Sequence, residues 1–323
     1  MIENSPEELA FLACLNDIHS LKKQKYIEYF EEHSSINDLY YDIFKVNQNT
    51  RKVYAEKIRL LIDKSVDIRD KKILEPYSNL MRDYQNRDVR ILPFYDSEYP
   101  QKVKKISNPP FIIFQKGKRE FLLNPAVAVV GTRKISPEGV DKVRDIVETC
   151  VRLDYVIVSG LALGTDTYAH KKAIQCGGKT IAVLPTDIDN IIPADNQKLA
   201  EQITKSGCLI SEVTHFAKMH KGRYLERNRI TSALSDAVII IESGEKGGSM
   251  RQADIAFKQG KKVYSVRPED SNAYAIAGHE KLLSNGAISI ESSKELSQYL
   301  LKINETKTMK GNKTKMATFA DFS

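Results

Sequence analysis

The chain has 323 residues, with 49 Lys or Arg against 42 Asp or Glu and a formal net charge of +7. This length suggests about two domains, and an apolar share of 41% is enough for a buried core, which excludes a wholly disordered protein. The positive balance indicates a polyanionic partner only if the excess charge gathers in one place.

The sequence also argues against a membrane protein, a secreted protein and a protein with a metal bound by cysteine thiolates. No run approaches the roughly 20 apolar residues that cross a bilayer, and the acidic first eight residues lack the basic start of a signal peptide. The four cysteines form no CxxC pair, and the six histidines show no metal-ligand spacing. We therefore expect a cytoplasmic protein with no disulfide, no metal and no cofactor.

Residues 1–90 are predicted to form an N-terminal all-helical domain. Apolar residues recur there three or four apart, and no glycine occurs before Gly117. Tyrosines and lysines between residues 22 and 41 would suit nucleic-acid contacts, but ordinary amphipathic helices have the same composition. Residues 91–125 contain five prolines around a strand-like run at 111–114. They are predicted to be an extended connector that adds an edge element to the next domain.

From residue 126 the pattern changes to short apolar runs separated by glycines and helical stretches. Strands are expected at 127–130, 156–158, 181–184, 208–210, 237–241, 263–266 and 288–290. Apolar runs without alternation indicate strands buried on both faces, hence a mostly parallel sheet. The fold prediction is an α/β, Rossmann-like, doubly wound domain over 126–300, with its functional crevice at the carboxyl ends of the strands. Residues 301–323, with five lysines against two acids, are predicted to be a flexible basic tail.

The first predicted strand leads directly into Gly131, Thr132 and Arg133. Ser136 followed by Pro137 has the pattern of a helix start, with a capping hydroxyl and proline at the first helical position. Exposed amides at such a turn, together with Arg133, suit a phosphate group. An ordinary strand-to-helix turn is the alternative.

Small residues follow the second strand. Ser159, Gly160 and Gly164 let a ligand come close to the backbone, but their spacing does not match the dinucleotide-binding fingerprint. Asp166 and His170 are four residues apart on an expected helix. We interpret them as a histidine ring tied to a carboxylate, with catalysis as the alternative. No catalytic residue is therefore predicted.

The most informative stretch is 216–230, where five Lys or Arg accompany a single acid, Glu226, and Tyr224 lies among them. Cations for phosphates and a ring for base stacking are the requirements of a single-strand binding platform. A solvated basic loop is the alternative. After the fifth strand, Gly247, Gly248 and Ser249 form a second glycine-rich loop that could hold a phosphate or act as a plain turn.

Taken together and in order, these motifs resemble the DNA processing protein A family (DprA, also called Smf). The resemblance runs from about Tyr95 to Ser289. It is carried by Tyr99-Pro100, Asn108-Pro109-Pro110, Gly131-Thr132-Arg133, Ser159-Gly160-Leu161-Ala162, Asp166-Thr167, Ala169-His170, Gly177 to Leu184, Arg227-Asn228-Arg229-Ile230, Leu234 to Ala237 and Gly248-Ser249.

The resemblance implies a non-enzymatic, single-stranded DNA-binding protein of the cytoplasm. Members of this family protect incoming DNA during natural transformation, form homodimers and deliver DNA to the RecA recombinase. The DNA-binding residues predicted for this chain are Gly131, Thr132, Arg133, Ser159, Gly160, Lys221, Tyr224, Arg227, Asn228 and Arg229. The phosphate-loop candidates are Gly164, Gly247, Gly248 and Ser249.

The chain departs from the family pattern at several positions. Leu163 stands where the family usually has Arg, although Arg251 could replace that charge, and the tail is too short for the winged-helix domain that many members carry. The rival hypothesis is a nucleotide-binding sensor or a phosphoribohydrolase-like enzyme on the same fold. Its available carboxylates would be Asp166, Glu242 and Glu245.

Overall fold

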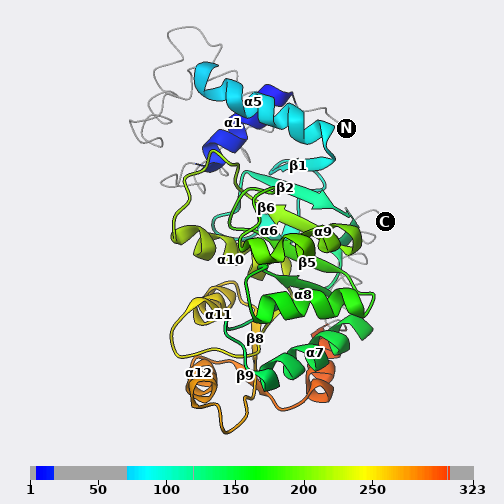
Figure 1. Ribbon diagram of the computed structural model, residues 1–323, viewed down its shortest axis with the longest axis vertical. Coiled ribbons are helices and arrows are strands. Elements are labelled where there is room, and N and C mark those ends of the chain that lie inside the picture. The colour runs from blue at the N-terminus through cyan, green and yellow to red at the C-terminus, as the bar shows by residue number, and fades with distance from the viewer. Residues whose placement is uncertain (1–4, 18–70, 119, 304, 306–323) are drawn as a thin grey trace, which may run out of the picture.

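A mixed sheet of nine strands organises the computed structural model (Figure 1), which describes residues 5–17, 71–118, 120–303 and 305. Its order is β1-β2-β6-β5-β4-β3-β7-β8-β9. The strands are β1 (Val89–Pro93), β2 (Ile112–Gly117), β3 (Ala126–Val130), β4 (Val156–Ser159), β5 (Thr180–Val183), β6 (Cys208–Ser211), β7 (Ala237–Ile240), β8 (Lys262–Val266) and β9 (Ile288–Ile290). The seven strands from β3 onward are parallel, whereas β2 pairs antiparallel with both β1 and β6.

The predicted α/β class with a mostly parallel sheet is confirmed, and each of the seven expected strands is present to within a residue or so. The reason is burial: every residue of β3, β4, β5, β6 and β7 is buried. In the segment 91–125, one edge strand was expected near 111–114. The structure has β2 there, but β2 lies between β1 and β6, so the edge strand is β1. The sequence pattern did not predict β1, which begins at Val89 within the segment expected to be helical.

Helices cover both faces of the sheet. They are α6 (Gln101–Lys104), α7 (Pro137–Arg152), α8 (Thr165–Gln175), α9 (Gln197–Ser206), α10 (Gly222–Leu234), α11 (Gly248–Lys258) and α12 (Ala273–Ser284). Val127 and Val129 of β3 share a core cluster with α7 and α8, whereas Ala128 and Val130 pack with α11. Because alternate residues of a strand point to opposite faces, these two clusters lie on opposite sides of the sheet.

The winding direction reverses at β3. This strand pairs with β4 on one side and with β7 on the other, so successive crossovers run first to one edge of the sheet and then to the other. The carboxyl ends of two adjacent strands diverge at such a switch point and leave a crevice between them. The loops after β3 and β7 are therefore where a ligand site is expected.

Two described helices of the N-terminal region, α1 (Pro6–Asp17) and α5 (Lys71–Asn86), contact each other at the β1–β2 end of the sheet. Every residue of α1 from 8 to 16 is buried. The helical prediction for the rest of residues 1–90, namely 1–4 and 18–70, lies outside the described residues.

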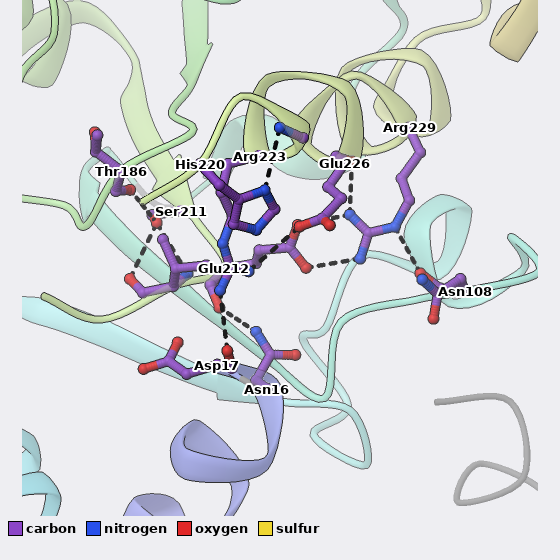
Figure 2. A network of polar contacts seen from close by, with 12 residues as sticks. Asn16, Asp17, Asn108, Thr186, Ser211, Glu212, His220, Arg223, Glu226 and Arg229 are labelled. Atoms are coloured by element: carbon purple, nitrogen blue, oxygen red, sulfur yellow. Dashed lines mark hydrogen bonds and ion pairs between the residues drawn. The ribbon is translucent and has the colours of Figure 1, made fainter. Parts of the chain in front are cut away.

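The last two residues of α1 are bound to the loop after β6 (Figure 2). Asn16 donates to the Glu212 carbonyl and accepts from the Phe111 amide at 2.9 Å. The Asp17 carboxylate accepts hydrogen bonds from the amide and hydroxyl of Thr214 and, at 3.2 Å, from the Tyr77 hydroxyl of α5. These contacts join α1 and α5 to the part of the sheet that precedes α10.

At the other end of the chain, a final helix begins at residue 293 and includes residues 301–303. The start of the predicted flexible tail at 301 is therefore too early, because Leu296 and Leu300 anchor this helix in the core. Apart from residue 305, the remainder of 301–323 lies outside the described residues. None of the described helices combines the length and apolar character that a membrane span requires.

The half-buried Asp17 gives the fold a testable pH dependence. Burial raises the pKa of Asp17 from its ordinary 3.8 to about 6, against the opposing effect of the Thr214 hydrogen bonds and of Arg223. The folded state then takes up a proton near pH 6 that the unfolded chain takes up only near pH 4. The contribution of Asp17 to stability therefore improves as the pH falls through this window.

We expect the free energy of unfolding of the wild type, minus that of Asp17→Asn, to rise by up to roughly 3 kcal/mol between pH 7 and pH 4. Urea titrations of both proteins across this range measure the difference, and effects of other titrating groups cancel in it. A difference that stays constant with pH would contradict the shifted pKa.

Candidate nucleic-acid interface

A pocket of about 240 Å³ lies at the switch point of the sheet. The end of β3 contributes residues 130–133 to its wall, and the loop after β7 contributes 246–249. The opposite wall comes from α10, with Tyr224, Leu225, Arg227 and Asn228. Three cations, Arg133, Arg227 and Lys246, face one carboxylate, Asp166, so the pocket carries an excess of positive charge.

The floor of the pocket is built by Arg227. Its guanidinium is buried and donates to the Val183 carbonyl of β5 at 2.9 Å. Asp166, also buried, accepts from the amides of Gly160 and Ala162 at 3.1 and 3.3 Å. Burial raises the pKa of Asp166, and the charge of Arg227 counteracts that rise. The two charges thus stabilise each other beneath the pocket.

Gly160 is required by this arrangement. A Cβ atom at position 160 would lie 1.6 Å from Nη1 of Arg227. Real Cβ atoms do not approach other atoms this closely, so any larger residue would displace the guanidinium from the Val183 carbonyl. The small residue after β4 therefore makes room for a side chain of the protein itself.

The rim pairs a cation with an aromatic ring. The Arg133 guanidinium carbon lies 5.4 Å from the centroid of the Tyr224 ring, within the range of a cation–π contact. Arg133 is exposed and Tyr224 is half-buried. A phosphate held by Arg133 and a base stacked on Tyr224 would therefore be close enough to belong to the same or adjacent nucleotides.

The turn from β3 into α7 has the predicted cap, since the Ser136 hydroxyl accepts from the Gly139 amide at 2.9 Å and Pro137 is the first helical residue. The anion at this helix start is Glu242, which accepts from the amide and hydroxyl of Ser136 at 3.0 and 2.5 Å. The Thr132 amide donates to the Glu242 carbonyl at 2.7 Å. These two amides are thus already occupied, which leaves the Arg133 side chain as the group that this turn offers to a ligand.

The glycine-rich loop after β7 opens into α11. Gly247 has a φ of +140°, a conformation that favours glycine. Both Gly247 and Gly248 have open space where a side chain would be, so a ligand can approach the backbone there. Ser249 shares a hydrogen bond of 2.8 Å with Ser243, which fixes the start of α11 to the end of β7.

The structure brings nine of the fourteen predicted site residues into this pocket: Gly131, Thr132, Arg133, Tyr224, Arg227, Asn228, Gly247, Gly248 and Ser249. The other five are elsewhere. Three of these, Ser159, Gly160 and Gly164, lie behind the lining. The Ser159 hydroxyl donates to the Val129 carbonyl at 2.7 Å, and Gly164 packs under the backbone of Thr132 and Arg133. Lys221 is exposed just before α10 and is not part of the lining.

Arg229 is the fifth of these residues, and its guanidinium lies outside this pocket, bound to Glu212 (Figure 2). Its guanidinium forms two hydrogen bonds of 2.6 Å with the Glu212 carboxylate and donates to the Asn108 carbonyl at 2.7 Å. Arg227 and Arg229 are two positions apart on α10, so their side chains point in different directions. Arg229 therefore fastens α10 to the loops after β6 and α6 and is directed away from this pocket.

The stretch 216–230, for which a solvated basic loop was the alternative, is helical from Gly222 onward. One further interpretation is wrong. His170 is not tied to Asp166, because its Nδ1 atom lies 2.6 Å from the Thr180 hydroxyl. Burial lowers the pKa of His170 to about 3, which keeps the ring neutral. It is a core residue that joins α8 to β5.

Seven lining residues are outside the predicted set: Val130, Ala162, Asp166, Leu225, Lys246, Gln252 and Tyr274. Lys246 had a readable signal, since it is a cation inside the glycine-rich loop. Tyr274 belongs to α12, and no sequence pattern indicated that it lines the pocket, because only the fold brings that helix beside the loop after β7. Arg251, the suggested replacement for a missing charge, is exposed but does not line the pocket.

Within the described parts of the chain, no group of His, Cys, Asp or Glu side chains could hold a metal ion. A doubly wound sheet, with a cationic pocket and a half-buried aromatic ring at its switch point, defines a Rossmann-like protein with an anion-binding crevice. Residues 90–301 match the profile of the DNA recombination-mediator protein A family. This chain belongs to that family.

Relatives and solved structures agree with this assignment. DNA processing protein DprA of Bacillus subtilis (strain 168) is 34% identical over 218 residues, which are 67% of this chain and 73% of the relative. The X-ray structure of DNA processing protein A from Streptococcus pneumoniae superposes with a TM-score of 0.70 at 27% identity, over 91% of this chain and 98% of that one. A structure of DNA processing protein A from Helicobacter pylori, described by its single-stranded DNA binding mode, superposes with a TM-score of 0.60 at 30% identity. The match covers 66% of this chain and 96% of that one.

The contact between Gly160 and Arg227 can be tested with a double-mutant cycle. We expect Gly160→Ala to lower the free energy of unfolding by about 1–3 kcal/mol, because the new methyl group displaces a buried guanidinium. In an Arg227→Ala background the same methyl group meets empty space and should cost much less. Urea unfolding of the four proteins measures this coupling, and an equal cost in both backgrounds would contradict the assigned contact.

Proposed function

We propose that this chain binds single-stranded DNA without sequence preference, and that the pocket at the switch point is the binding site. The observation that carries the proposal is the Arg133–Tyr224 pair at the rim, 5.4 Å apart, above the buried charge of Arg227. Cations attract the phosphates of any strand, and every base has a face that can stack on a ring. None of these contacts reads the edge of a base.

Two further points support the proposal. The Helicobacter pylori protein, described as binding single-stranded DNA, is 30% identical to this chain. The anion sites that the fold creates, at the start of α7 and beside Arg227, are already filled by Glu242 and Asp166. Arg133 and Lys246 are therefore the lining cations left for an external anion.

We also propose that the chain acts as a binding protein in the cytoplasm and not as an enzyme. The one carboxylate in the pocket, Asp166, already accepts two backbone amides and faces Arg227, which suits a structural role better than acid–base chemistry. Natural transformation, delivery of DNA to a RecA-type recombinase and homodimer formation are the roles that family membership suggests for it. Each of these is a proposal about the protein in its cell.

The first test concerns Arg133. Arg133→Ala should weaken binding of oligothymidine by about tenfold at low salt and make the slope of log affinity against log salt shallower by about 0.7, the contribution of one phosphate contact on a single strand. Fluorescence anisotropy at four salt concentrations measures both quantities.

Lys171→Ala is the matched control for Arg133→Ala, since it removes one exposed cation from α8, which supplies only Asp166 to the pocket. Its affinity should stay within twofold of the wild type. Equal affinities of wild type and Arg133→Ala would overturn the site. Binding of mononucleotides in place of oligonucleotides would favour the rival nucleotide sensor.

The second test separates stacking from charge at Tyr224. Tyr224→Ala should cost about 1–3 kcal/mol of binding free energy for every oligonucleotide sequence, because stacking on an aromatic ring contributes this amount per base. Tyr224→Phe keeps the ring and should bind like the wild type. If the Phe variant were as weak as the Ala variant, the hydroxyl and not the ring face would be the group that binds DNA.

A further inference from the structure

A second basic cavity lies on the side of the sheet where the parallel strands begin, opposite the carboxyl ends that form the first pocket. Its volume is about 550 Å³. Its cations come from four separate segments: Lys102 in α6 and Lys105 after it, Arg229 in α10, Lys258 at the end of α11, and Lys261 just before β8. Among the described residues, none that lines this cavity is acidic. A cavity of this size is large enough for a nucleotide unit.

Part of this positive charge is matched by the protein itself. Arg229 is neutralised by Glu212, and Lys102 pairs with the buried Asp236 at 2.8 Å. The Lys261 ammonium group donates to the carbonyls of Ala233 and Ser235 at the carboxyl end of α10. These three cations are thereby fixed in position around the cavity.

The remaining two cations are at the rim. Lys105 and Lys258 are both exposed, and neither forms an ion pair within the described part of the chain. The acid nearest to Lys258 in sequence is Asp254, which is also exposed and lies one turn earlier on α11. Gathering like charges around one cavity raises the free energy of the empty protein, and an anionic ligand would relieve this repulsion.

Helix α11 connects the two basic sites. Gly248, Ser249 and Gln252 at its start line the first pocket, whereas Ile255 and Lys258 near its end line the second cavity. Eleven helical residues span about 16 Å. At 3.4 Å per nucleotide, about five nucleotides cover this distance. A single strand longer than this can therefore reach both sites.

Resting on the function proposed above, we propose that the second cavity binds phosphate groups of the same DNA strand that occupies the first pocket. Lysine suits this task, since an ammonium group is a point charge that contacts a backbone phosphate without reading sequence. Short strands then use only the first pocket, and long strands use both.

The test compares two oligothymidine lengths on the full-length chain by fluorescence anisotropy: about two nucleotides, too short to reach both sites, and about 25 nucleotides. The double variant Lys105→Ala/Lys258→Ala should bind the short strand within twofold of the wild type. It should bind the long strand about tenfold more weakly, with a salt slope shallower by about 1.4, twice the contribution of one phosphate. The control variant Lys171→Ala/Lys198→Ala, which removes two exposed cations from α8 and α9, should leave both lengths unchanged.

The outcomes separate this proposal from the function on which it rests. If the wild type binds neither length, the proposed function fails. If the wild type binds both lengths and the double variant matches it on the long strand, only the second cavity is refuted. If the double variant loses affinity for ATP but not for the long strand, the cavity takes free nucleotides and the proposal of a continuous DNA path is overturned.

Discussion

The buried charge of Arg227 is the constraint on which the rest of the site depends. This one side chain starts on α10, reaches the carbonyl of Val183 at the end of β5, faces Asp166 on α8 and fills the space above Gly160 after β4. Removing one of these two facing buried charges leaves the other uncompensated, at a cost of about 3–5 kcal/mol. Arg227 and Asp166 therefore determine where these elements meet, and with them the position of the pocket.

The fold uses its own carboxylates at the places where a Rossmann-like protein often binds a ligand's phosphate. Glu242 occupies the start of α7, and Asp166 occupies the amides after β4. At these two places the backbone amides are occupied, so the exposed cations of the pocket, Arg133 and Lys246, and the open backbone of Gly247 and Gly248 are left to contact a ligand. Side-chain cations tolerate variation in the position of a phosphate, which suits an irregular single strand better than a mononucleotide of fixed shape.

Secondary structure could be predicted from the sequence where a segment is buried and apolar throughout. It could not be predicted where the buried residues are polar. The parallel strands were predicted because they are uninterrupted apolar runs. Helix α10 was not, because its buried side includes Arg223, Arg227 and Asn228 and so lacks an apolar stripe. Because this helix was not predicted, the sequence could not show that the side chains of Arg227 and Arg229 point in different directions. The Asn16–Glu212 contact joins residues 196 positions apart, and no local pattern reports such a contact.

The attachment of α1 has a consequence for the order in which the chain folds. Asp17 binds Thr214, 197 residues further along the chain. At a synthesis rate of about 5–20 residues per second, roughly 10–40 s pass before the partner of Asp17 is made. During that interval α1 can already contact α5, β1 and β2, which are made earlier, but the loop after β6 is missing. The attachment of α1 through Asp17 therefore belongs to the late steps of folding.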